Sequence, residues 1–501
     1  MKILTNGQMR RSDEYTIVTQ KIPSIELMER AGRALADETE RLAGKGQVLC
    51  VCGGGNNGGD GFVCARVLQA RGVPTDVVFF AERTSEDCLI NKEKWQAVGG
   101  SLFTEIPNQS YSVIVDCLVG TGLKGGLLGK NLQAVQQINA LKKNGTKVLS
   151  ADVPSGLCGD NGIVIGLAVE ADVTLCIGEI KAGVLLADGL DYAGEVKRVD
   201  IGIILSEDSY AEWLDESAVR RLLPKRKRNV HKGSFGKAAI VAGSKAYTGA
   251  AYLSAAACLR AGAGYTTLFV PENILPFYLL KAPEILLKSI CDGTEFSFEQ
   301  SRMKALLSYD SIAYGMGMQC MESVALGAEY LLKNYTGKLI LDADGLNSLA
   351  KYKKESLNRL FSEKKCDVVL TPHCKEFSRL TGVPVKEILE LGMCAATEYA
   401  KENEVTLLLK NAATVITDGQ KIHVNTAGNS GQAKGGSGDV LSGVIAGLCA
   451  MGLCGYDGAC AAAYWCGIAA ESAAQKVGEY SLTATDVIAE LGSALITRLH
   501  S

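Results

Sequence analysis

The stretch NTAGNSGQAKGGSGDVLSGVIAGL, residues 425–448, places a loop of glycines and small polar residues directly before an apolar helical run. Free backbone N–H groups and the helix dipole converge where such a loop enters a helix, so this junction is typical of an anion site. Asp439 stands at or near the first turn of the expected helix. Its carboxylate suits a base that takes a proton from a hydroxyl attacking a phosphoryl group, and it equally suits a helix N-cap. The spacing leaves both interpretations open.

Polar side chains also follow three other strand-like runs of the C-terminal half. Lys410 and Thr414 flank the turn of LKNAATVI, His373 ends VVLTPH, and Asp342 and Asp344 follow LIL. Open α/β sheets bind ligands at the carboxyl ends of their strands. We therefore expect these residues along one rim, with Lys410 and Thr414 available to a nucleotide phosphate.

Apolar, strand-like runs alternate with helical segments along the whole chain. Strands that are apolar throughout indicate a parallel sheet with both faces covered. The first half has such runs at residues 47–53, 75–81, 112–120, 147–156 and 172–178, and the second half at residues 237–244, 264–271, 311–317, 338–345, 367–373 and 405–410. This pattern predicts an α/β protein with two doubly wound domains. A charged segment at residues 205–228 marks the boundary, which gives domains at 1–215 and 225–501.

Bulk composition excludes several classes of protein. The 501 residues carry a net charge of −3, which argues against a general nucleic-acid or anionic-membrane surface, and the basic run 225–228 is expected to be a solvated linker. The apolar stretch 440–453 is too short to span a bilayer and predicts a buried helix. The N-terminus has no signal-peptide character. We therefore expect a cytoplasmic protein with no nucleic-acid or membrane partner.

The cysteines and histidines form no recognisable metal or disulfide pattern. Seventeen cysteines are scattered without a CxxC motif, and the four histidines stand far apart. Because many of these cysteines lie in apolar runs, we expect buried thiols of a reducing compartment.

Five ordered motifs of the C-terminal half together resemble one enzyme family. They are HKGSFGKAAIVAGS, LDADGLN, TPHCKEFSRLTG, LKNAATVITDG and the glycine-rich stretch from residue 425, and they extend over about residues 225–495. The set resembles the ADP/ATP-dependent NAD(P)H-hydrate dehydratases, which have a ribokinase-like fold. The resemblance implies that ADP or ATP, with Mg²⁺, phosphorylates the hydroxyl of the S form of hydrated NADH or NADPH. Elimination then restores the dihydropyridine ring.

The resemblance also implies roles for particular residues. Asp439 would be the catalytic base and Gly438 its partner in the anion hole. The adenine nucleotide would contact Lys410, Asn411, Ala412, Ala413, Thr414 and Gly438, and the hydrate would contact Ala250, Gly317, His373 and Asp439. Three residues depart from the family pattern: Cys374 and Lys375 replace Pro and Gly, and Asn411 replaces Gly. Lys375 adds a charge near the rim, whereas Asn411 tolerates left-handed backbone well.

The N-terminal half carries a second glycine-rich loop, VCGGGNNGGDGFVCARVL, at residues 51–68. Gly53, Gly55 and Gly58 satisfy G-x-G-x-x-G, which alone is a weak sign of dinucleotide binding. Glu82 follows the next strand, where a ribose-binding acid could lie. However, the chain has no recognisable pair of residues for hydride transfer, and this loop is more polar than the fingerprint requires.

Oxygen-bearing side chains follow two further strands of this half: Asp116 in IVDCLVGTGLKG, and Asp152 with Ser155 in SADVPSG. Such oxygens suit a hard cation, although turn formation explains any one of them as well. The three motifs in order resemble the NAD(P)H-hydrate epimerases, with a Rossmann-like fold over about residues 1–210.

By this resemblance the first domain would move a hydroxyl between the R and S faces of the hydrated nicotinamide ring. Asn57, Asp116 and Ser155 would bind potassium, and Asp152 is our hypothesis for the acid/base residue. The substrate would contact Asn56, Asn57, Gly58, Gly59, Asp60, Gly120, Thr121, Gly122, Leu123, Lys124, Gly125, Gly126 and Asp152.

Together the two resemblances predict one bifunctional repair enzyme that acts on NADHX and NADPHX, and they imply a homo-oligomer. Two alternatives remain open. One is a ribokinase-like kinase for a vitamin precursor or sugar with an appended nucleotide-binding domain. The other is a non-catalytic dinucleotide sensor.

Overall fold

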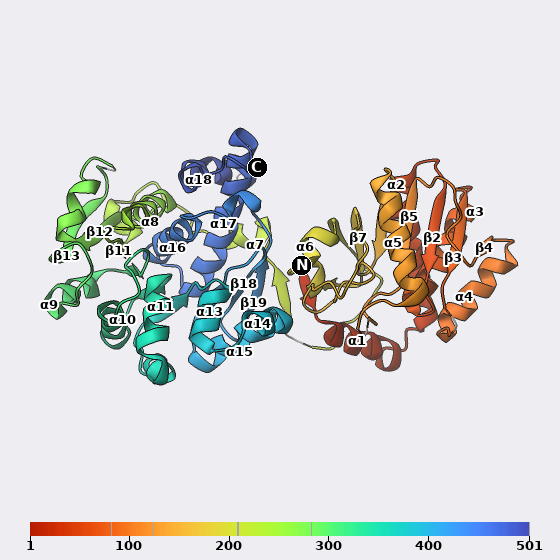
Figure 1. Ribbon diagram of the computed structural model, residues 1–501, viewed down its shortest axis with the longest axis horizontal. Helices are drawn as coiled ribbons and strands as arrows, with labels where there is room; N and C mark the ends of the chain where they lie inside the picture. The colour runs from red at the N-terminus through yellow and green to blue at the C-terminus, as the bar shows by residue number, and fades with distance from the viewer. Residues whose placement is uncertain (82, 124, 208–209, 282, 500–501) are drawn as a thin grey trace. The chain divides into compact units, whose positions relative to one another are not determined.

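The computed structural model describes residues 1–81, 83–123, 125–207, 210–281 and 283–499 (Figure 1). The chain forms two compact units, Met1–Ala211 and Glu212–Ser501. Within the described ranges, no helix combines the length and apolar character that a membrane span needs. Most of the cysteines are buried, as predicted.

The first unit is built on a parallel sheet with the strand order β4-β3-β2-β5-β6-β7-β9. These strands are β2 (Val48–Cys52), β3 (Thr75–Phe79), β4 (Leu102–Phe103), β5 (Val113–Cys117), β6 (Lys147–Ala151), β7 (Val173–Ile177) and β9 (Glu195–Val199). A short parallel pair, β1 (Lys2–Leu4) and β8 (Ile180–Lys181), lies outside this sheet. The order reverses between β2 and β5, so a ligand crevice is expected where their carboxyl ends meet.

Helices cover both faces of this sheet. Val48, Cys50 and Cys52 of β2 pack in a cluster with α2 (Ser24–Ala43), α3 (Asn56–Ala70) and α4 (Glu86–Ala97). The alternate residues Leu49 and Val51 pack with α5 (Gly129–Lys143) on the other side. The remaining helical segments are α1 (Asn6–Glu14), the π-helical turn Tyr15–Thr19, the 3₁₀ turn Ala182–Leu185 and α6 (Gly189–Tyr192). Burial on both faces explains why the strands are apolar throughout.

The second unit has a larger sheet with the strand order β13-β12-β11-β14-β15-β16-β17-β18-β19-β10. Its strands are β10 (Ala211–Trp213), β11 (Lys237–Val241), β12 (Tyr265–Pro271), β13 (Leu286–Cys291), β14 (Ser311–Tyr314), β15 (Lys338–Leu341), β16 (Asp367–Leu370), β17 (Thr406–Leu409), β18 (Thr414–Thr417) and β19 (Ile422–Asn425). Pairing is parallel from β13 to β17, and β18 runs antiparallel to both of its neighbours. Here the order reverses between β11 and β14.

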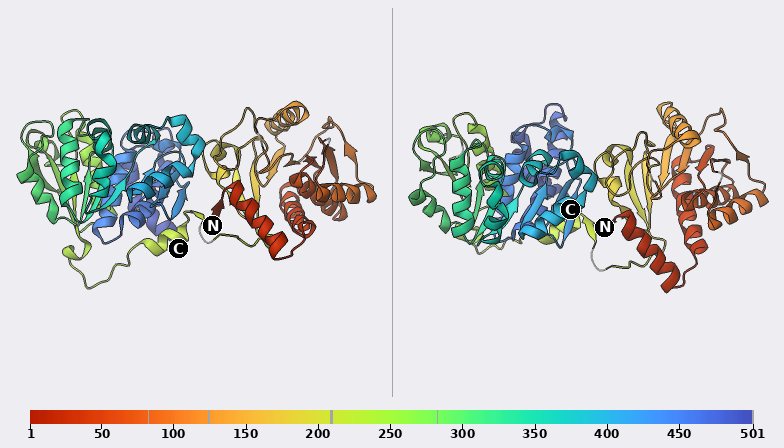
Figure 2. Two further views of the ribbon diagram at one scale, coloured as in Figure 1. Left: turned by 90° about the horizontal axis from the view of Figure 1, so that it is seen from below. Right: turned by 60° about the horizontal axis from the view of Figure 1, so that its bottom comes forward.

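Helices again lie on both sides of this sheet (Figures 1 and 2). The helices are α7 (Glu216–Leu222), α8 (Thr248–Ala261), α9 (Gln300–Met303), α10 (Glu322–Asn334), α11 (Asp344–Tyr352), α12 (Leu357–Ser362), α13 (Cys374–Thr381), α14 (Val385–Leu391), α15 (Met393–Asn403), α16 (Ser437–Ala450), α17 (Gly455–Val477) and α18 (Ala484–Leu499), and 3₁₀ turns lie at Lys232–Phe235, Glu272–Tyr278, Lys304–Ser308, Lys354–Ser356 and Ser430–Gln432. The predicted helix after the glycine-rich loop is α16, and it is buried.

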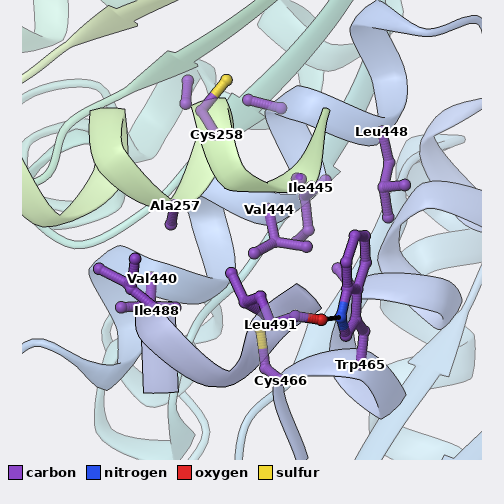
Figure 3. Packing of buried hydrophobic residues seen from close by; sticks show 14 of the residues in the cluster. Ala257, Cys258, Val440, Val444, Ile445, Leu448, Trp465, Cys466, Ile488 and Leu491 are labelled. Atoms are coloured by element: carbon purple, nitrogen blue, oxygen red, sulfur yellow. Dashed lines mark hydrogen bonds between the residues drawn. The ribbon is translucent and has the colours of Figure 1, made fainter. Parts of the chain in front are cut away.

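The core beside α16 explains its small residues. Helices α8 and α16 pack so closely that a Cβ on Gly443 would overlap the carbonyl of Ser254. Val444 and Ile445 of α16 face α17 and α18, where the indole of Trp465 donates to the Leu491 carbonyl at 2.6 Å (Figure 3). Because interiors are packed densely, this packing against α8, α17 and α18 fixes the position of α16.

Candidate functional site

Asp439 lies in the first turn of α16 but does not cap it. The N-cap is Gly436, whose φ of 101° is a left-handed conformation that glycine adopts without strain, and no side-chain cap bond is recorded there. Asp439 is the third residue of the helix, two residues after Ser437. The capping alternative therefore has no support in this geometry.

The carboxyl group of Asp439 is tuned to exchange a proton near neutrality. Its pKa is raised from 3.8 to about 7, chiefly by burial and also by the nearby carboxylates of Asp342 and Asp344, while the ammonium of Lys410 lowers it. A general base works best when its pKa lies near the working pH.

A buried ion pair holds the other side of this site. Asp342, at the end of β15, accepts a hydrogen bond from the Lys410 ammonium at 2.8 Å and from the Ser442 hydroxyl of α16 at 2.7 Å. Burial disfavours the charged lysine, but Asp342 and Glu376 outweigh that cost and the pKa of Lys410 is raised. The pair joins β15, β17 and α16 at one point. From the sequence, Asp342 was expected at the rim, but its pairing with Lys410 was not predicted.

Gly438 lies against this lysine. A Cβ on Gly438 would lie 3.3 Å from the Lys410 ammonium and 3.7 Å from Asp342 Oδ2. The amide groups of a first helical turn lack partners within the helix, and here they begin beside a cation. An anion that approaches the start of α16 therefore meets both amide protons and an ammonium group.

The segment Lys410–Thr414 is the turn between antiparallel strands β17 and β18, with Leu409 paired to Val415. Asn411 and Ala412 are exposed, whereas Ala413 is buried. The structure thus gives Lys410 and Thr414 the strand-end positions predicted from the sequence.

The glycine-rich loop that precedes α16 is held by hydrogen bonds to α17 and to the segment that follows it. Gly428 N–H donates to Glu471 at 2.9 Å, and the Asn429 amide donates to the Ala470 carbonyl at 3.0 Å, both on α17. The Lys434 ammonium donates to the carbonyls of Tyr480 and Leu482 at 2.6 and 2.8 Å. These bonds position the loop before any ligand binds.

Two residues predicted for the hydrate pocket meet at the reversal between β11 and β14. Gly317 follows β14 with φ 65°, and a Cβ there would lie 2.9 Å from the Cβ of Ala250 on α8. The close approach leaves no room for a side chain at position 317.

His373 has a structural bond that the sequence analysis missed. Its exposed ring begins α13, and Nδ1 accepts the N–H groups of Lys375 and Glu376 at 3.1 and 3.2 Å. Glu376 in return accepts the His373 N–H at 2.9 Å. The backbone of His373 pairs with Lys410, which keeps it at the rim. A histidine followed three residues later by Glu was the available signal of this capping box.

In the first unit, the predicted glycine-rich loop joins β2 to α3, which begins at Asn56. A Cβ on Gly58 would overlap the carbonyl of Gly53, so the turn requires glycine. Gly59, Asp60 and Phe62 are buried in this helix.

Three predicted ion ligands gather around the end of β5. Asp116 is fully buried, and its two oxygens accept the Ser155 hydroxyl at 2.6 Å and the Ser155 N–H at 2.9 Å. Asn57, with its amide oriented to satisfy its hydrogen bonds, accepts from Gly120 N–H and donates to the Ala151 carbonyl, each at 3.3 Å. Burial raises the pKa of Asp116, which hydrogen bonds from Ser155 partly offset.

Asp152 follows β6 with φ 69°, a left-handed conformation that is rare for a residue other than glycine. Its Oδ1 accepts the Ile177 N–H at 3.1 Å and forms an ion pair with Lys181, whose side chain is 1% exposed. Burial and the charge of Asp152 raise the pKa of Asp60, and burial raises that of Asp13 to about 6. The sequence did not lead us to expect Lys181 and Asp13 at this site. The position of Lys181 as the one charged residue in the apolar run IKAGVLLA could have indicated that it is buried.

The loop after β5 is mostly open. Gly122, Gly125 and Gly126 are exposed, while Thr121 and Leu123 are half-buried. Lys124, predicted to contact substrate, and Glu82, the ribose-binding candidate, lie outside the described residues.

Fold and site define a two-domain α/β protein whose strand ends form a rim of charged and polar residues in the second unit. Two family profiles match the chain: one described as NAD(P)H-hydrate dehydratase covers residues 238–492, and one described as YjeF-related protein N-terminus covers residues 24–183. The predicted fold class, an α/β protein with two domains that are each built on a doubly wound sheet, is confirmed.

Curated relatives match along almost the whole chain. The bifunctional NAD(P)H-hydrate repair enzyme of Thermofilum pendens is 33% identical over 99% of this chain and 96% of its own length. The enzymes of the same name from Moorella thermoacetica and Escherichia coli are 33% and 30% identical, over 97% and 96% of this chain and 95% and 92% of their own. The chain belongs to the family of bifunctional NAD(P)H-hydrate repair enzymes.

Solved structures match the second unit. A protein of Streptococcus mutans described as hypothetic is 26% identical with a TM-score of 0.50, covering 57% of this chain and 99% of its own. The ADP/ATP-dependent NAD(P)H-hydrate dehydratase of Bacillus subtilis, co-crystallised with ATP and Mg²⁺, is 30% identical with a TM-score of 0.49, covering 57% and 98%.

Proposed function

We propose that this chain repairs nicotinamide cofactors in two steps: it epimerises the R and S hydrates of NADH and NADPH, and it dehydrates the S form with ADP or ATP. Family membership over nearly the full chain supports both activities. The observation that carries the second step is Asp439, a carboxylate with its pKa near 7 at the amide end of a buried helix.

The two activities would divide between the two units. The dehydratase profile begins at residue 238, within our expected domain of 225–501, and the other profile ends at residue 183, within 1–215. We assign the epimerase to the first domain and the dehydratase to the second. Fusing the two makes chemical sense because hydration yields both epimers and the dehydratase takes one.

For the dehydratase, Asp439 would take the proton from the hydrate hydroxyl as it attacks a phosphoryl group. Phosphate would then leave with the electrons of the C–O bond, the adjacent ring carbon would release a proton to solvent, and the ring double bond would return. Lys410 and the amides from Gly438 onward would hold the nucleotide phosphates, because an ammonium and free N–H groups meet there. The turn from Asn411 to Thr414 would lie along the nucleotide, and Ala250, Gly317 and His373 would line the hydrate pocket.

Magnesium fits this rim. Mg²⁺ is usually held by one or two carboxylates together with substrate phosphates. Two carboxylates, those of Asp342 and Asp344, lie close enough to Asp439 to raise its pKa. When bound, the ion would neutralise phosphate charge. Of the carboxylates, Asp344 has a pKa raised by burial, and its Oδ2 accepts the Gln319 N–H at 2.8 Å.

For the epimerase, Asn57, Asp116 and Ser155 would hold one potassium ion. The fit rests on chemistry: an amide, a carboxylate and a hydroxyl converge, with the Val119 carbonyl 3.1 Å from the Ser155 hydroxyl, and only one of these groups is charged. Potassium would supply a fixed positive charge beside the substrate loop.

Asp152 would be the acid/base residue of the epimerase, and the residues of the two loops would contact the substrate. The contacts would come from Asn56 to Asp60 and from Gly120 to Gly126. We also propose a homo-oligomer in the cytoplasm, where buried thiols remain reduced. Light scattering on the purified protein tests the oligomer.

The test of both activities is one assay. The full chain is given mixed R and S NADPH hydrates with ADP and Mg²⁺, and recovery of NADPH absorbance is followed. Complete recovery at a rate above spontaneous epimerisation requires both activities. A plateau after the S form is consumed would leave the first unit without activity, and a stable phosphorylated product would instead indicate a kinase.

A further inference from the structure

Lys181 is a buried cation with no role in the assignments above. It lies in β8, its side chain is 1% exposed, and its ammonium donates to the Ile177 carbonyl at 2.6 Å. Its ion pair is with Oδ1 of Asp152. A buried charge is costly unless it is paired and hydrogen-bonded, so this lysine depends on Asp152.

The same contacts fix how Asp152 is presented. Oδ1 takes both the ammonium of Lys181 and the N–H of Ile177. Among the described residues, no hydrogen bond to Oδ2 is recorded, and the Asp152 side chain is 14% exposed. One oxygen is therefore held by two donors, while the other has no recorded donor among the described residues and belongs to a side chain that is partly exposed.

The ammonium of Lys181 also lies close to several acidic side chains. Asp13 from α1, Asp60 from α3 and Asp152 after β6 all interact electrostatically with it, and the Cys176 thiol of β7 lies nearby. Like charges crowded in a buried place favour protonation, and an ammonium opposes this. Removing Lys181 would leave the acids without that opposing charge.

We propose that Lys181 is a positioning residue of the epimerase, which holds Oδ1 of Asp152 so that Oδ2 exchanges the proton with the hydrate. The proposal rests on the proposed epimerase function and on Asp152 as its acid/base residue. Lys181 acts through Asp152 and not by touching the substrate, because its ammonium is buried and already bonded to two acceptors.

A double-mutant cycle in the full chain tests this. The R hydrate of NADPH is supplied without nucleotide, so that dehydration is silent, and formation of the S hydrate is followed by chromatography after subtraction of the spontaneous rate. Lys181→Met should lower kcat at least about tenfold with KM within about threefold, and Asp152→Asn should lower kcat about 100-fold. Because both act through one carboxylate, the double variant should match Asp152→Asn within about twofold.

Matched controls separate positioning from folding. Lys197→Met removes another ion-paired lysine of the first unit, bound to Glu38 at 2.9 Å, and should leave kcat unchanged. Lys181→Arg keeps the charge and should recover most of the activity. Unfolding is followed by calorimetry, and if Lys181→Met does not fold, Lys181→Gln replaces it under the same criteria.

Three outcomes would overturn the proposal: a Lys181→Met variant as active as Lys197→Met, losses that multiply in the double variant, or full activity of Asp152→Asn. In each case the wild-type chain would still epimerise the hydrate. Failure of the proposed function is different, since the wild-type chain itself would then leave the R hydrate unchanged.

Discussion

Both units place an aspartate after a parallel strand and pair it with a lysine, but the exposed partner differs. In the first unit Asp152 is 14% exposed and Lys181 is 1% exposed. In the second unit Lys410 is 21% exposed and Asp342 is 2% exposed. The same kind of ion pair thus leaves the carboxylate as the more exposed partner in one unit and the ammonium in the other.

The reversal matches the chemistry proposed for each unit. An epimerase needs a proton exchanger, so we expect the more exposed acid to face the substrate while the cation is buried. A site for nucleotide phosphates needs positive charge, so we expect the more exposed lysine to face the ligand while its acid is buried. In the second unit the proposed proton exchanger is a separate residue, Asp439, in the first turn of α16.

The largest effect is expected when the carboxylate of Asp439 is removed. Asp439→Asn should lower the rate of dehydration at least about 100-fold, because a general base contributes about 10² to 10⁴ in rate. Recovery of NADPH from the S hydrate with ADP and Mg²⁺ measures it. Asp457→Asn, at the same third position of α17, is the matched control and should keep full activity. A loss below about tenfold would reduce Asp439 to a structural role.

The two lysines should differ in which constant they change. Lys410→Met should raise the KM for the nucleotide by about 10- to 100-fold, since a hydrogen bond to a charged group contributes about 1.5–3 kcal/mol. Lys181→Met should leave the KM for the hydrate nearly unchanged. Lys364→Met is the control, because that lysine is 10% exposed and lies before β16, at the opposite end of the strands from the rim. An unchanged nucleotide KM for Lys410→Met would contradict the proposal that the ammonium of Lys410 binds the nucleotide phosphates.

The dehydration rate should depend on pH through Asp439. With its pKa raised to about 7, the base is mostly protonated at pH 6 and mostly ionised at pH 8. The rate should therefore rise about tenfold between these values, provided that proton abstraction limits it. Rates at saturating nucleotide over pH 5.5–8.5 measure this, and a profile that is flat across neutrality would contradict the assignment.

The smallest effect concerns stability. The unfolded chain releases the Asp439 proton near pH 3.8, while the folded protein keeps it until about pH 7, so ionisation increasingly destabilises the fold across this window. Asp439→Asn removes that penalty and should stabilise the second unit by about 1–2 kcal/mol at pH 8 after allowance for partial exposure. At pH 4 the variant and the wild type should unfold alike. Calorimetry at both pH values measures the difference.

Local patterns were sufficient to predict the strands that carry the site. The runs that became β2, β5 and β6, and those that became β15 to β17, were visible because strands buried on both faces must be apolar throughout. Glycine before an apolar helix likewise predicted α16. The edge strands β9 and β13 were missed, since their residues are only partly buried and lack a continuous apolar run.

The motifs also named most of the polar residues at the two rims, because each stands within a few positions of a strand end. Contacts between distant segments were beyond their reach. Lys181 meets Asp152 across 29 positions, and Lys410 meets Asp342 across 68. Such pairs form only when the sheet brings separate strand ends together.

From its order of residues alone, this chain specifies two doubly wound sheets with polar loops at their carboxyl edges, since strand period, apolar runs and glycine turns are local properties. The three-dimensional fold alone decides which member of each ion pair is buried and which acid keeps its proton at neutral pH. Those outcomes depend on burial and on charges from distant segments, and burial is a property of the packed molecule.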